Sequence, residues 1–77
     1  MIQLALDGEG RIYLDGQPLA RADLDRRFQD AAAPGRPAPA LHLRADRGTR
    51  YERVTDVMVA AQKAGIARIA FVTEPAR

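Results

Sequence analysis

The chain has 77 residues, a formal net charge of +2 and 47% hydrophobic residues, which is the composition of one small soluble globular domain. It contains no Ser, Cys, Asn or Trp, so serine and cysteine nucleophiles, disulfides and thiolate metal sites are excluded. The 12 basic residues are interleaved with 10 acidic ones, a pattern more typical of a solvated surface than of a nucleic-acid track.

Residues 2–14 are expected to form a β-hairpin. Their apolar side chains recur at every second position, at Ile2, Leu4, Leu6, Ile12 and Leu14. Asp7–Gly10 supplies the turn, because glycine tolerates the positive φ that other residues avoid. A second tight turn at Asp15–Gly16 follows. Since Pro18 cannot donate to a strand ladder, any strand through residues 17–19 must be short and lie at an edge.

Residues 20–33, "ARADLDRRFQDAAA", are predicted to form a helix. Leu24 and Phe28 lie four residues apart and so share one face. Asp23 and Asp25 fall in the early part of this helix, where its dipole favours carboxylates. A pair of catalytic carboxylates is an alternative interpretation of these two residues, but the helix-start interpretation is favoured. Residues 34–40, "PGRPAPA", are predicted to form a loop.

A strand is expected next, over residues 41–45, with Leu41, Leu43 and Ala45 on one face. His42 lies on the opposite face, and it fits a half-exposed sheet residue better than a ligand or a base. The lone histidine, without any cysteine, does not complete a structural zinc site with the usual ligands.

A helix–strand pair follows. The segment Thr49–Glu52 matches the capping-box pattern, in which the threonine oxygen accepts a hydrogen bond from the first turn of a helix. The helix buries a stripe of apolar residues, Val54, Val57, Met58, Ala61 and Ala64, and Gly65 suits a left-handed residue at its end. In the last strand, Ile69 and Phe71 alternate with Ala70 and Val72.

The predicted fold is therefore an α+β, two-layer sandwich of order β-β-α-β-α-β, with an optional short strand at residues 17–19. Two helices pack on one face of a four- or five-stranded mixed sheet. The other face is left uncovered, and it carries Gln3, Ala5, Tyr13, His42, Arg44, Ala70 and Val72. An uncovered edge and face suggest a docking surface, either for a second copy in a homodimer or for an incoming peptide strand.

The segment "LHLRADRGTRYERVTDVMVAAQKAGIARIAFVTE" resembles the carboxy-terminal half of the periplasmic domain of the ExbD/TolR family. The resemblance lies in a strand that ends in Ala45-Asp46, a helix that opens at Tyr51 and closes at Ala64–Ile66, and the strand that follows. The preceding "IQLALDGEGRIYLDGQPL" is similar to the paired strands of the same family. The similarity covers nearly all of residues 1–77, which we treat as a single domain.

This resemblance implies a function that composition does not. ExbD works in the bacterial inner membrane with ExbB, which uses the proton-motive force to energise TonB for transport across the outer membrane. An ExbD-type chain would have one transmembrane helix with a proton-handling aspartate, which the present residues lack, so we expect an excised periplasmic domain. The expected partners are an ExbB-like subunit, a TonB-like peptide strand and a second copy of the chain. TolR, with peptidoglycan as its partner, is the alternative.

The resemblance also implies a site. Partner-binding residues are predicted to be Ile69, Ala70, Phe71, Val72 and Thr73 of the last strand, together with Asp46. The alternation places Phe71 on the core face, so its importance in the family could reflect packing, with the strand backbone making the direct contacts. Asp46 fits a turn before the helix better than a partner contact. No catalytic, cofactor or metal site is predicted. An RNA-binding sheet would need exposed aromatic residues, and its open face has only Tyr13.

Overall fold

The computed structural model describes residues 1–35 and 37–73, and it has the predicted α+β architecture. The optional third strand is present. The elements in chain order are β1 (Ile2–Leu6), β2 (Ile12–Leu14), β3 (Gln17–Leu19), α1 (Arg21–Ala31), β4 (Leu41–Ala45), α2 (Tyr51–Ala64) and β5 (Ile69–Thr73).

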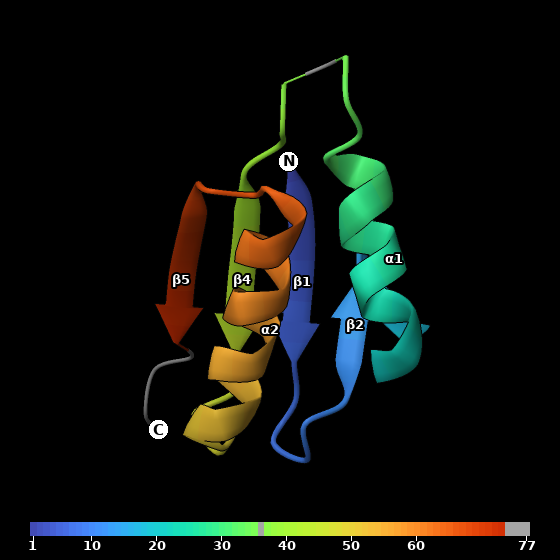
Figure 1. Ribbon diagram of the computed structural model, residues 1–77. Coiled ribbons are helices and arrows are strands. Elements are labelled where there is room, and N and C mark those ends of the chain that lie inside the picture. Colours follow the sequence, from blue (N-terminus) through green and yellow to red (C-terminus); the bar gives the residue numbers. More distant parts are fainter. Residues whose placement is uncertain (36, 74–77) are drawn as a thin grey trace.

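The five strands form one mixed sheet in the order β3-β2-β1-β4-β5. The three amino-terminal strands pair antiparallel, whereas β1, β4 and β5 run parallel to one another. Both helices lie on the same side of the sheet, in front of it in Figure 1. The chain therefore forms two layers, as predicted, and it leaves the second face of the sheet without a covering element among the described residues.

The hairpin turns use the residues that the sequence placed there. Asp15 and Gly16 have φ values of 49° and 86°, so both central residues of the β2–β3 turn are left-handed. Gly10 takes a φ of 85° in the β1–β2 turn. The short β3 strand at the sheet edge contains Pro18, which confirms that this segment is an edge.

The core lies between the sheet and the two helices. The inward-facing apolar residues of β1, β2, β4 and both helices are buried or half-buried, and Leu24, Phe28, Leu41, Leu43 and Ile66 have no exposed surface. Met58 and Ala64 are partly buried against this cluster. Helix α2 ends at Gly65, whose φ of 102° confirms the left-handed terminus.

One bidentate ion pair joins the two helices. Arg21, the first residue of α1, donates to both carboxylate oxygens of Asp56 on α2, at 2.6 and 3.0 Å. This side-chain hydrogen bond raises the pKa of Arg21 and lowers the pKa of Asp56. The pair identifies the flank of α2 that faces α1, and the opposite flank is therefore turned towards β5.

Candidate functional site

The outer edge of β5 is the main candidate site, because β5 is the last strand of the sheet and pairs with β4 on one side. The Leu41 N–H donates to the Arg68 carbonyl at 2.8 Å, so the backbone groups of Arg68 point towards β4. Backbone direction alternates along a strand, so Ala70 and Val72 also point inwards. The N–H and C=O groups of Ile69, Phe71 and Thr73 consequently point out of the sheet.

The predicted site residues of β5 differ in how far their side chains are exposed. Ile69 is half-buried and packs against the core. Ala70 is exposed, and Phe71 and Val72 retain 47% and 40% of their surface. Thr73 pairs with Ala45 through its backbone, and its side chain lies outside what the structure describes.

The prediction that Phe71 belongs to the core was wrong. Phe71 is in register with Leu43, so the two side chains share the helix-facing side of the sheet. Leu43 is completely buried because helices cover it, whereas Phe71 lies one strand further out and is 47% exposed. The alternation therefore identified the correct face, but the edge position of β5 leaves the ring partly in solvent.

The opposite edge of the sheet differs from β5. Strand β3 is only three residues long, and its central residue, Pro18, offers no N–H to a further strand. Short edge strands that contain proline resist pairing with other chains. Strand β5 has five residues and no proline, so among the described strands it is the edge that can accept another strand.

The bare face of the sheet has the residues that were predicted for it, and all of them are exposed or half-buried. The strand registers align one row across the full sheet, formed by Pro18, Tyr13, Ala5, Arg44 and Val72. His42 is half-buried on this face beside Gln3 and Ala70. No group of three or more potential metal ligands occurs within residues 1–35 and 37–73.

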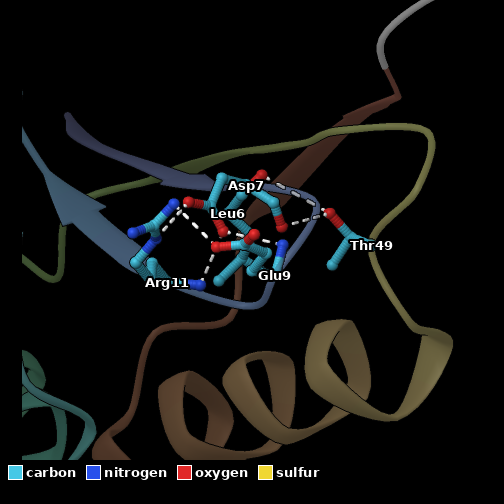
Figure 2. A network of polar contacts seen from close by, with 5 residues as sticks. All are labelled: Leu6, Asp7, Glu9, Arg11 and Thr49. Carbon is cyan, nitrogen blue, oxygen red and sulfur yellow. Dashed lines mark hydrogen bonds and ion pairs between the residues drawn. The ribbon is translucent and has the colours of Figure 1, made fainter.

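A cluster of polar contacts lies around Asp7, close to the ends of β1 and β4 (Figure 2). One oxygen of the Asp7 carboxylate accepts from the N–H groups of Glu9 and Arg11 at 2.9 and 2.8 Å. Its other oxygen accepts from the Arg11 guanidinium at 2.7 Å. These bonds hold the β1–β2 turn closed.

Thr49 corrects the capping-box prediction. Its hydroxyl donates to the Asp7 carbonyl at 2.9 Å, so it joins the β4–α2 loop to the β1–β2 turn (Figure 2). The residue at the N-cap is Arg50, which makes no side-chain capping bond. The sequence has the residues of a capping box. The Thr49 hydroxyl nevertheless donates to a carbonyl 42 positions earlier in the chain, and it does not cap the helix.

Asp46 organises the loop between β4 and α2. Its carboxylate accepts from the Gly48 N–H at 2.8 Å, and its carbonyl accepts from the Thr49 N–H at 2.9 Å. A Cβ atom on Gly8 or Gly48 would come within 3.2 or 3.1 Å of the same carboxylate oxygen. These contacts support the turn interpretation, and a role of Asp46 in partner binding stays a prediction.

We expect Thr49→Val to lower the free energy of unfolding by about 1 kcal/mol, because it removes a half-buried hydrogen bond between two loops. Chemical denaturation followed by circular dichroism measures this change. Thr55→Val is the matched control, since the Thr55 hydroxyl donates to the Tyr51 carbonyl one turn earlier in the same helix, in a hydrogen bond that is exposed. Equal losses in the two variants would contradict the bridging role of Thr49.

We expect the Asp7 carboxylate to stabilise the fold in its charged form. Hydrogen bonds from the Arg11 N–H, the Arg11 side chain and the Glu9 N–H lower the pKa of Asp7 below its ordinary value of 3.8. A lowered folded-state pKa means that the stabilisation is present above pH 3.8 and is lost as the pH falls through the folded value. The gap in unfolding free energy between wild type and Asp7→Asn should therefore narrow on acidification below pH 3.8, as denaturation at pH 6 and pH 2.5 will show.

Comparison with known proteins supports the resemblance seen in the sequence. The family model described as "Biopolymer transport protein ExbD/TolR" matches residues 1–76. This chain belongs to the ExbD/TolR family. Two curated relatives, each named Biopolymer transport protein exbD1, come from the B100 and ATCC 33913 strains of Xanthomonas campestris pv. campestris. Each is 32% identical over 71 residues, which cover 92% of this chain.

The ExbD/TolR chain spans only 50% of the length of these relatives. Within residues 1–35 and 37–73, neither helix combines the length and the apolar character that a membrane crossing requires. The names of both relatives agree with the ExbD branch that the sequence favoured over TolR.

The sequence interpretation missed the exposure of one aromatic residue. Tyr51 was assigned only to the start of a helix, yet it is 82% exposed at the first position of α2. Its spacing of seven residues from Met58 places the two residues on one stripe of the helix, but the packed fold leaves Tyr51 in solvent while Met58 packs partly against the core.

Proposed function

We propose that this ExbD/TolR domain works in the periplasm as part of an ExbD-type motor subunit that couples the proton-motive force to TonB-dependent transport. In the whole protein, a transmembrane helix would anchor the domain in the inner membrane and contact an ExbB-like subunit. The domain itself serves as the docking module. The observation that carries this proposal is the open β5 edge on a domain of a biopolymer transport family.

Strand addition is the binding mode that the β5 edge favours. The outward N–H and C=O groups of Ile69, Phe71 and Thr73 provide hydrogen bonds that any extended segment satisfies through its own backbone. A TonB-like segment bound in this way becomes the sixth strand of the sheet. A pulling force on such a segment would pass through β5 to the parallel strands β4 and β1, which lie at the centre of the sheet.

The same edge accommodates a second copy of the chain, which is the basis of the proposed homodimer. In an antiparallel pair centred on Phe71, that residue faces its own equivalent, and Ile69 faces Thr73 of the other copy. All three residues point their backbone groups outwards, so each pair exchanges two hydrogen bonds. Peptide and second copy then compete for one edge, and dilution of the domain should raise its apparent affinity for the peptide.

The proposal is tested by titrating isotope-labelled domain with a peptide from the periplasmic segment of a TonB-like protein. We expect progressive amide shifts at residues 69–73 and smaller ones at the β3 edge. The control peptide has the same sequence with N-methyl groups at every residue, because these remove the donors needed for strand pairing. Unchanged β5 amides at millimolar peptide, or equal binding of the methylated control, would refute strand addition.

A further inference from the structure

We propose that the β5 edge selects a strand with two consecutive apolar residues, one for each face of the sheet. This inference rests on the strand addition proposed above, and it adds the chemistry of the incoming segment. Residues that pair across two strands place their side chains on the same face of the sheet, and neighbours along one strand point to opposite faces. The surface that β5 exposes on each face therefore determines which residues the incoming segment should carry.

Phe71 provides the exposed apolar surface of β5 on the helix-facing side. Its partner in register on β4 is Leu43, which is completely buried, and 47% of Phe71 remains exposed. Ile69 points to the same side, but it is half-buried and packs against the core cluster. A β-branched side chain directly opposite Phe71 would cover the ring, and aromatic pairs of this kind stabilise sheets. The gain comes from burial of apolar surface, so a polar side chain of the same shape gains less.

Val72 provides the corresponding apolar surface on the bare face. It follows Phe71 directly, so strand alternation points its side chain to the opposite side. Its partner in register on β4 is Arg44, and 40% of Val72 remains exposed. Ala70 points to the same face and is exposed, but its methyl group offers little surface to cover. No described strand lies beyond β5, so an incoming side chain opposite Val72 would contact it directly.

The two exposed residues are consecutive, and this determines the pattern that the edge selects. Within residues 1–35 and 37–73, the exposed large hydrophobic residues are Met1, Tyr51, Val59, Phe71 and Val72. Phe71 and Val72 are the only two of these that follow one another in the chain. A segment that alternates, with apolar residues on one face, would cover only one of them. A segment with two consecutive apolar residues covers both.

A second copy of the chain meets the same requirement. In the antiparallel pair centred on Phe71, that residue faces its own equivalent, and Val72 faces Ala70 of the other copy. The consecutive residues Ala70 and Phe71 of each copy are both apolar, so they contact Val72 and Phe71 of the other copy. The proposed homodimer and the proposed peptide complex therefore depend on the same chemistry.

Three peptides of equal length and equal charge test this selection against the isotope-labelled 77-residue chain. One has Val-Val at its centre, the second has the same composition with a threonine between its two valines, and the third has threonine in place of both valines. Valine and threonine both favour strands, so the peptides differ mainly in where a methyl group replaces a hydroxyl. Amide shifts of residues 69–73 give each dissociation constant. The concentration of the domain is held fixed, because a second copy competes for the edge.

We expect the Val-Val peptide to bind tightest. The peptide with separated valines covers one exposed residue instead of two, so it should bind about threefold more weakly. The threonine peptide should bind about tenfold more weakly, since the backbone separates the two faces and their contributions add. Added salt should leave this order unchanged, because burial of apolar surface does not depend on screening.

Two variants of the domain assign each contribution to its face. Phe71→Ala and Val72→Thr should each bind the Val-Val peptide about threefold more weakly and remove its advantage over the peptide with separated valines. Val59→Thr is the matched control, because Val59 is 41% exposed on α2 and lines the groove between the helices, and it should leave all three affinities unchanged. Circular dichroism verifies that each variant is folded. A Val-Val advantage that survives in either β5 variant would overturn the assignment.

The outcomes separate this inference from the proposed function. If separated valines bind as tightly as adjacent ones, or all three peptides bind equally, two-sided apolar selection is wrong and strand addition stands. If none of the three binds while a TonB-like segment does, the inferred chemistry is again wrong. If neither these peptides nor the TonB-like segment perturbs the β5 amides, the proposed function itself fails.

Discussion

Replacing Phe28 by alanine is expected to lower the free energy of unfolding by about 3–5 kcal/mol. The Phe28 ring has no exposed surface and lies in the single core between α1 and the sheet. A core in a chain of this size rarely supplies more than about 3–5 kcal/mol of net stability. Phe28→Ala should therefore leave much of the protein unfolded at room temperature, as urea denaturation followed by circular dichroism will show.

The other phenylalanine of the chain is the matched control for this loss. Phe71 is 47% exposed, so Phe71→Ala should cost only about 1 kcal/mol, which is part of the value for burying a whole ring. The same variant should weaken binding of a strand to β5, because it removes the exposed part of a ring at this edge. If Phe71→Ala were as destabilising as Phe28→Ala, the position of Phe71 at an exposed edge would be contradicted.

Proline scanning of β5 should separate the outward backbone groups from the inward ones. Phe71→Pro removes an N–H that points out of the sheet, so the β4–β5 ladder keeps its hydrogen bonds and the fold is retained. Peptide binding at the edge should fall by at least about tenfold, because the central donor for an added strand is lost. Isotope-labelled Phe71→Pro, titrated with the TonB-like peptide, measures this loss.

Ala70→Pro is the reciprocal variant. The Ala70 N–H points towards β4, and a proline there removes a ladder bond inside the sheet. We expect this variant to unfold at lower urea concentration than Phe71→Pro by a difference of about 2–3 kcal/mol in unfolding free energy. Phe71→Ala is measured alongside, because it removes the ring and keeps the N–H. Equal stability of the two proline variants would show that the inferred alternation of β5 is out of phase.

In the proposed role, the domain binds a segment of a partner and carries the force on that segment. This role does not depend on a reactive side chain. Strand β5 is the last of three parallel strands, and it lies at the opposite edge of the sheet from the protected β3. A segment captured there would be connected to the central strands by continuous backbone hydrogen bonding. The loop cluster around Asp7, Asp46 and Thr49 closes the carboxyl ends of β1 and β4, and it stabilises the same part of the sheet.

Most of the fold follows from local sequence. Period-two alternation identified the inward faces of β1, β2 and β4, and helical spacing identified the buried stripes of α1 and α2. Glycine at positions 10, 16 and 65 marked three places where the chain turns with positive φ. Pro18 indicated that β3 is an edge strand that does not readily pair with a further strand. These signals are readable without coordinates because each depends on neighbouring residues and on the preferences of one side chain or one backbone unit.

The tertiary structure alone decided the features that depend on distant parts of the chain. The sequence by itself determined that Phe71 faces the helix layer, but its exposure depends on how far α2 reaches across the sheet. The capping pattern at Thr49 was present, yet packing brought the Asp7 carbonyl to its hydroxyl. A local pattern specifies the side on which a residue lies, whereas burial and hydrogen-bond partners are set by whichever remote segment packs against it.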